Sequence, residues 1–140
     1  MERIFSDDRH EVLRFEPSED VTLNLVNFVL EEKIEAAWIS GIGSASEVEL
    51  GYYYLPEKEY QKKVFTEDME IVNLTGSVGL LDDGPAIHLH GAFGLSDYRV
   101  VGGHVHRLIS NTTVEVYLEK MDGTLKRSYD EDTGLNLLKS

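Results

Sequence analysis

The sequence contains no cysteine, which excludes disulfide bonds, thiolate zinc sites and cysteine nucleophiles from any mechanism. Basic residues are also scarce: 13 lysines and arginines stand against 26 acidic residues, so the formal net charge is −13. The longest basic groups, Lys62-Lys63 and Lys126-Arg127, are interpreted as solvated surface charge. Because binding to a nucleic-acid backbone depends on clustered Lys and Arg, direct nucleic-acid binding is not expected.

Long hydrophobic runs are missing as well. No apolar run approaches the length that crosses a membrane, and residues 1–8 lack the basic start and apolar stretch of a signal peptide. We therefore expect a cytoplasmic protein with no membrane partner. Its 140 residues, 41% of them hydrophobic, are enough for a real core, and no repeat or linker divides them. A single domain over residues 1–140 is predicted.

Histidines are few, but four of the five fall in two short runs, His88-Leu89-His90 and His104-Val105-His106. Side chains two residues apart on a β-strand point to the same face of the sheet, so each pair should aim together. The segment between the runs carries Gly, Ser and Asp, which favour a chain reversal and place the two strands side by side. The alternative is that these histidines only make ordinary hydrogen bonds or face solvent.

The clustering favours a metal site. Neutral imidazole is a good ligand for zinc and other transition metals. A zinc ion held by three protein nitrogens keeps a fourth position for water or substrate. The sequence thus predicts an open site for a divalent metal, with zinc, iron, nickel and copper as the candidate ions.

One strong helix is predicted, from Val21 to Lys33, with Ser18 as its N-cap and Glu19 and Asp20 in its first turn. Four of its apolar residues form one stripe: Val21, Leu25, Phe28 and Val29. Three more widen that stripe past half the circumference: Leu23, Val26 and Leu30. A helix this apolar must be covered on two sides, so we expect a sheet on one side and a neighbouring subunit on the other.

The rest of the chain favours strands. Strand patterns cover residues 11–15, 36–40, 48–54, 60–65, 69–78 and 112–120, besides the two histidine runs. Turns are expected at Gly41-Ile42-Gly43-Ser44 and at Asp82-Asp83-Gly84-Pro85, and the apolar end of residues 125–138 is expected to dock on the body or on a partner. The predicted fold class is α+β, a mainly antiparallel β-sheet with one principal helix packed on it.

Other residues are weaker candidates for the site. Glu70 and Glu115 stand in apolar strands and are candidate acid/base groups for a metal-bound water, or else face solvent or pair with arginine. Asp97 is either a group that orients a ligand imidazole or only a turn former. Arg99 is a candidate for binding an anionic substrate, the alternative being an exposed loop cation. Gly102-Gly103 allows either a close approach of backbone or ligand, or a bulge.

Several short segments along the chain, none specific alone, form a recognisable pattern by their order and spacing. They are Gly41-Ile42-Gly43-Ser44, Glu49-Leu50-Gly51-Tyr52, Met69-Glu70-Ile71-Val72-Asn73-Leu74-Thr75-Gly76-Ser77, His88-Leu89-His90, Val101-Gly102-Gly103-His104, Thr113-Val114-Glu115-Val116 and Asp130-Glu131-Asp132-Thr133-Gly134-Leu135. With them the whole chain resembles the plants and prokaryotes conserved (PPC) domain family, in its prokaryotic stand-alone branch. The resemblance implies an α+β fold with a central antiparallel sheet, assembled as a homotrimer.

The resemblance also implies a ligand set. In the prokaryotic branch the positions of His88, His90 and His104 hold a divalent metal, often zinc. His106 is outside the usual pattern and is a candidate second-shell group or fourth ligand. The plant branch carries an AT-hook ahead of the domain, and no such segment occurs here.

Two functions remain open at this point. One is a metal-dependent hydrolase or small-molecule binder whose substrate the sequence does not identify. The other is a DNA-associated or regulatory interaction module in which the metal is structural.

Overall fold

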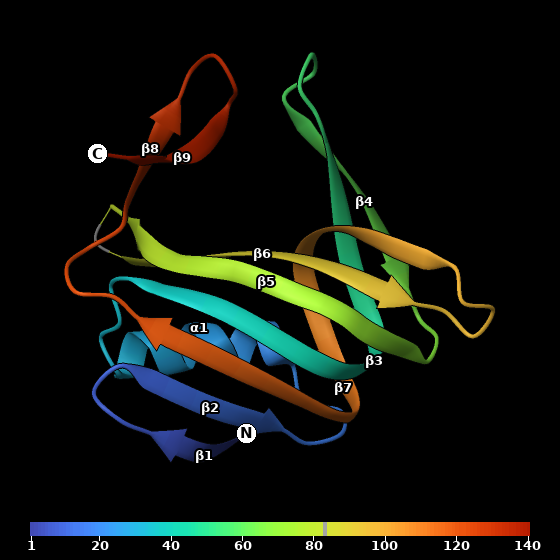
Figure 1. Ribbon diagram of the computed structural model, residues 1–140. Coiled ribbons are helices and arrows are strands. Elements are labelled where there is room, and N and C mark those ends of the chain that lie inside the picture. The colour runs from blue at the N-terminus through green and yellow to red at the C-terminus, as the bar shows by residue number, and fades with distance from the viewer. Residues whose placement is uncertain (83) are drawn as a thin grey trace.

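The computed structural model describes residues 1–82 and 84–140, which form nine strands and one helix. In chain order these are β1 (Glu2–Ser6), β2 (His10–Phe15), α1 (Val21–Glu31), β3 (Ala37–Tyr54), β4 (Glu59–Phe65), β5 (Met69–Leu81), β6 (Gly84–Gly94), β7 (Val100–Lys120), β8 (Lys126–Asp130) and β9 (Leu135–Lys139). The described pairings are antiparallel except for β5 with β8. The predicted α+β class is therefore confirmed (Figure 1). In the described part of the chain, no helix has the length and apolarity needed to span a membrane.

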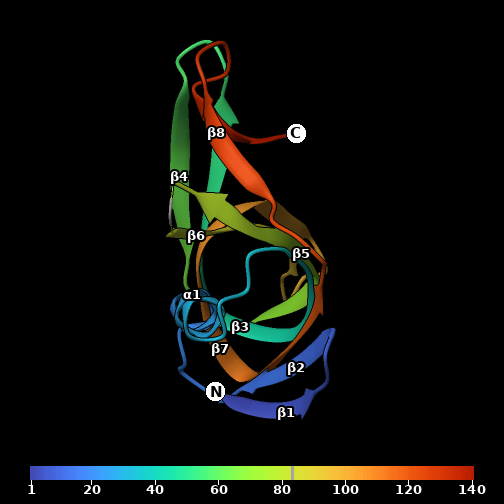
Figure 2. The same ribbon diagram turned by 90° about the vertical axis from the view of Figure 1, so that its left-hand side faces the viewer.

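The sheet curls until it closes on itself. β3 pairs with β5, β5 with β6, β6 with β7, and β7 with β3, so these four strands surround a common interior (Figure 2). Closure requires β7 to bend, because its first residues pair with β6 and its later residues pair with β3 and β2. Two hairpins, β3–β4 and β8–β9, project from the same end of the molecule (Figure 1).

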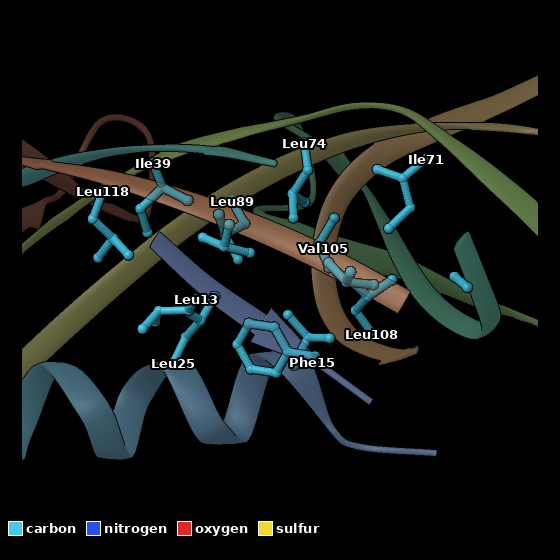
Figure 3. Close-up of a cluster of buried hydrophobic side chains, with 14 of the residues drawn as sticks. Leu13, Phe15, Leu25, Ile39, Ile71, Leu74, Leu89, Val105, Leu108 and Leu118 are labelled. Carbon is cyan, nitrogen blue, oxygen red and sulfur yellow. The ribbon is translucent and has the colours of Figure 1, made fainter. Parts of the chain in front are cut away.

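The helix packs against the core through the apolar stripe that the sequence predicts. Val21, Leu25, Phe28 and Val29 are buried, and Leu25 points toward Leu13 and Phe15 of β2 (Figure 3). In contrast, the side chains of Leu23 and Leu30 are 58% and 60% exposed in the single chain. The neighbouring subunit that is expected to cover them stays a prediction.

The start of the helix differs from the prediction. Asp20, not Ser18, is the N-cap: its carboxylate accepts a hydrogen bond of 2.9 Å from the amide of Leu23. The Asp20 carboxylate also pairs with Arg107 of β7, a tertiary contact that helps to hold it in the capping position. Glu19 and Asp20 therefore precede the first turn, and the helix ends at Glu31 instead of Lys33.

The glycines near residue 42 do not form the predicted turn. β3 runs without interruption from Ala37 to Tyr54, and its register against β5 and β7 shifts around Gly41 and Gly43. Gly43 has a φ of +134°, and a Cβ there would overlap the carbonyl oxygen of Thr113 on β7. The conformational freedom of glycine, which suggested a turn, here lets a strand bend and lets two strands lie close together.

The reversal predicted at residues 82–85 falls between two strands. β5 ends at Leu81 and β6 begins at Gly84. One residue of that predicted turn, Asp83, lies outside the described residues.

Candidate metal centre

The two histidine runs lie on adjacent antiparallel strands, as the sequence predicts. His90 of β6 is directly opposite His104 of β7. On the other side of β6, Thr75 and Ser77 of β5 are opposite His90 and His88. Directly opposed residues share a face of the sheet, so the closed part of the sheet brings three imidazoles together from two strands.

The three rings form a compact triangle. Their centroids are 5.0 Å apart for His88 and His90, 5.1 Å for His88 and His104, and 5.6 Å for His90 and His104. One ring nitrogen from each histidine lies within 4.8 Å of the other two. Ligand nitrogens around a tetrahedral zinc ion are about 3.3 Å apart. Modest side-chain rotation therefore suffices for all three to bind one ion.

Burial prepares these imidazoles to be neutral ligands. Burial first, and then the neighbouring charges of His106, His88 and His90, lower the pKa of His104 to about 4. Burial, followed by the charge of Arg127, also lowers the pKa of His88. Both rings are consequently unprotonated near neutral pH, and their nitrogen lone pairs need not compete with protons for a metal.

One buried atom fits a metal in particular. The Nδ1 atom of His104 is buried and has no hydrogen-bond partner among the described residues. A buried polar atom without a partner costs free energy, and a bound cation removes that cost by accepting the lone pair. The chemistry and placement of the three histidines thus fit a divalent ion.

The lowered pKa of His104 predicts that the metal-free protein loses stability on acidification from about pH 7 to about pH 5. Between its ordinary pKa of 6.5 and its folded pKa of about 4, the unfolded chain takes up a proton that the folded chain does not. Stability therefore rises with pH across this window. The measurement is the urea midpoint of chelator-treated protein at the two pH values. The asparagine in His104→Asn cannot take up a proton, so this variant should lose less stability between the two pH values. An equal loss of stability in both proteins would contradict the prediction.

Glycines let the histidine strands approach their neighbours closely. A Cβ on Gly103 would lie 2.7 Å from the carbonyl oxygen of Gly51, and one on Gly102 would lie 2.8 Å from that of Gly91. The β6–β7 register shows no shift at these positions. Of the two alternatives for Gly102-Gly103, the structure has the close approach of backbones.

His106 lies beside the triad without belonging to it. Its ring centroid is 4.6 Å from that of His104, and Tyr60 of β4 packs against both rings at 5.0 and 5.1 Å. The group of ring nitrogens that lie close enough to share an ion contains the other three histidines. The role of His106 as a second-shell group or fourth ligand stays a prediction.

Asp97 and Arg99 interact with each other in the turn between β6 and β7. The Asp97 carboxylate accepts hydrogen bonds from the Arg99 backbone amide at 3.0 Å and from its Nε at 2.5 Å. Both side chains are exposed. This is the geometry of the turn-forming alternative for Asp97 and the loop-cation alternative for Arg99.

The two glutamates are placed away from the histidines. Glu70 is exposed at the start of β5, opposite Gly94 at the far end of β6. Glu115 is exposed on the later part of β7, opposite Arg14 of β2. The structure does not bring either carboxylate to the imidazoles.

A pocket beside the triad contains residues that the sequence did not single out. Its volume is about 250 Å³, and its lining includes His88, His104, Tyr60 and Arg127. The sequence suggested surface charge for Arg127, whereas the structure places it half-buried on β8. The signal that pointed the right way was the apolar end of the chain: β8 pairs with β5 of the body, and β9 pairs with β8.

The comparisons with known proteins agree with this fold. A structure from Bacteroides thetaiotaomicron, described as a candidate DNA-binding protein, is 30% identical with a TM-score of 0.93 and covers 96% of this chain and 94% of its own. A metal-containing protein from Archaeoglobus fulgidus is 33% identical with a TM-score of 0.88 and covers 100% of this chain and 99% of its own. A plant- and prokaryote-conserved protein from Pyrococcus horikoshii is 28% identical with a TM-score of 0.87, over 98% and 95% of the two chains.

A comparison with curated proteins found no match. The model of the Plants and Prokaryotes Conserved (PCC) domain matches residues 3–122. That span contains β2 to β7, all but the first residue of β1, and all three triad histidines. On these grounds the chain belongs to the Plants and Prokaryotes Conserved domain family.

Proposed function

We propose that this protein holds a divalent metal ion, preferably zinc, through His88, His90 and His104, and that a small molecule binds at the remaining coordination position. The observation that carries the proposal is the buried, unpartnered Nδ1 of His104 at the border of a pocket. The metal-containing relative from Archaeoglobus fulgidus supports it. When bound, such an ion supplies a Lewis acid that polarises a ligand oxygen and lowers the pKa of coordinated water.

Binding of a small molecule has more support than its hydrolysis. Hydrolysis at a metal ion usually needs a general base within hydrogen-bond reach of the attacking water. The described residues that line the pocket include no aspartate or glutamate, and Glu70 and Glu115 lie elsewhere. Hydrolysis is therefore the second candidate, with the ion alone activating water.

The arrangement of charges gives no comparable support to direct DNA binding. Among the described residues, four arginines already pair with carboxylates of the same chain: Arg3, Arg14, Arg99 and Arg107. Phosphate binding requires such side chains to be free and clustered. A DNA-associated role for this acidic chain would depend on a partner that supplies the basic surface.

Cobalt substitution tests the proposed function. The full chain is stripped with a chelator and reloaded with Zn²⁺ or Co²⁺, and elemental analysis is expected to find about one ion per chain. Adding azide to the cobalt form should change its visible absorption, because an open position accepts an external ligand while a closed structural site does not. Failure to retain either ion would refute the metal site. An azide-insensitive spectrum would leave a structural metal and refute small-molecule binding.

A further inference from the structure

Arg127 differs from the other arginines of the described chain. The chain has six arginines, of which four form ion pairs, and Arg9 is exposed beside a turn. Arg127 is half-buried, and no described aspartate or glutamate lies within ion-pair distance of it. A partly buried charge without a counter-charge is less stable than a paired one, so a cation kept in this state points to an anion that comes from outside.

The guanidinium of Arg127 is held in place and still has donors to offer. Its Nη2 donates to the hydroxyl of Ser77 on β5 at 2.9 Å, and its Nη1 donates to the carbonyl of Asn136 on β9 at 3.2 Å. Its Nε is buried and has no hydrogen-bond partner among the described residues. A guanidinium has five N–H donors, so an entering anion would meet an oriented group with donors to spare.

The pocket places this cation close to the metal centre. Arg127, His88 and His104 all line the same pocket of about 250 Å³. The charge of Arg127 is also close enough to His88 to lower its pKa, as a smaller cause than burial. The described lining contains no carboxylate, although the chain has 26 acidic residues. A metal ion and an arginine in an acid-free pocket form a locally positive site in a strongly negative protein.

Most of the remaining pocket wall is apolar, and Tyr60 and Asn136 are its other polar members. Leu81 and Ile87 contribute from β5 and β6, while Leu135 and Leu137 contribute from β9. A bare inorganic anion would leave these side chains against water. A ligand with a short apolar part would cover them and gain roughly 25 cal/mol for each Å² of apolar surface removed from water.

We propose that this pocket binds a small carboxylate with a short apolar tail, its carboxylate lying between the metal and the Arg127 guanidinium and its tail lying against the leucines of β9. This inference rests on the proposed metal site and names the class of its ligand. A planar carboxylate matches the paired N–H donors of a guanidinium, and its oxygens are also suitable metal ligands.

Calorimetry on the zinc-loaded full chain tests the carboxylate, with butyrate as the probe and butyramide as its uncharged counterpart. Butyrate should bind and butyramide should not. Arg127→Gln should weaken butyrate binding by about 10- to 100-fold, the range expected when a charge-assisted hydrogen bond is lost. Arg99→Gln is the matched control, since it removes an exposed arginine from the turn between β6 and β7, and it should leave the affinity unchanged.

Two further variants keep the test decisive if Arg127→Gln destabilises the β8–β9 hairpin. Arg127→Lys keeps the charge and should retain part of the affinity. Ala86→Leu narrows the pocket from β6 without touching the arginine, and it should weaken butyrate binding while the zinc content stays the same. Thermal unfolding midpoints identify any variant that has lost its fold.

The outcomes separate this inference from the metal proposal. Two results would overturn the carboxylate pocket alone, both in protein that retains zinc. In one, butyrate binds no better than butyramide. In the other, butyrate binds Arg127→Gln as tightly as the parent protein. Stronger competition by inorganic phosphate than by butyrate also overturns it. Butyrate binding that depends on Arg127 in a protein that retains no zinc supports the arginine site and overturns the metal.

Discussion

Replacing His104 with alanine is expected to lower the affinity for zinc by more than ~100-fold, a larger loss than is typical when only a group supporting a ligand is removed. The His104 ring centroid lies 5.1 Å from that of His88 and 5.6 Å from that of His90, and its Nδ1 is buried with no hydrogen-bond partner among the described residues. The other two histidines both lie on β6, so without His104 the ligand set comes from one strand alone.

The fifth histidine provides the control for this prediction. His10 lies on β2, where its Nδ1 is 3.0 Å from the carboxylate of Asp7 and its ring stacks on Tyr117. His10→Ala removes an imidazole from the same protein and should leave zinc binding unchanged. Competition with a chromophoric chelator measures both affinities. Equal zinc affinity in the His104 variant and the parent protein would rule out the triad as the metal site.

Replacing Gly76 with alanine is expected to destabilise the fold by about 3 kcal/mol and to weaken zinc binding as well. A Cβ on Gly76 of β5 would overlap the backbone carbonyl oxygen of His88 on β6 and approach the Leu89 side chain at 2.8 Å. The overlap with backbone cannot be relieved by turning a side chain. β6 must move away from β5, and His88 moves with it.

Gly84 offers a matched substitution on the neighbouring strand. A Cβ there has no described contact closer than 3.9 Å, to the carbonyl oxygen of Leu81, so Gly84→Ala should change stability little. Urea denaturation gives the free energy of unfolding, and the chelator competition gives zinc affinity. If Gly76→Ala matches Gly84→Ala in both measurements, the close contact between β5 and β6 is not needed for stability or for zinc binding.

Short-range patterns predicted most of the fold and the core of the candidate site. Alternation along a strand was enough to pair His88 with His90, and a turn rich in Gly, Ser and Asp was enough to place the strand of His104 beside theirs. The helix stripe named the four residues that are buried. These features depend on neighbours within a few positions of each other, where local geometry decides.

Features that depend on distant contacts were not predictable in the same way. Ser18 is a suitable helix cap by residue type, but the cap is Asp20, which also contacts Arg107 on the distant strand β7. The glycines at 41 and 43 suit a turn or a bent strand equally, and the position of β7 selects the bend. The burial of Arg127 comes from the parallel pairing of β8 with the distant strand β5. No periodic pattern in the sequence around Arg127 could predict that pairing.

The β8–β9 hairpin separates the two halves of the pocket along the chain. The family model ends at residue 122, whereas Arg127, Leu135 and Leu137 lie beyond it and form one wall of the pocket. The three clustered imidazoles lie on β6 and β7, within the span that the family model matches. Substitutions confined to this terminal hairpin would therefore reshape the organic part of the pocket and leave the imidazole cluster intact.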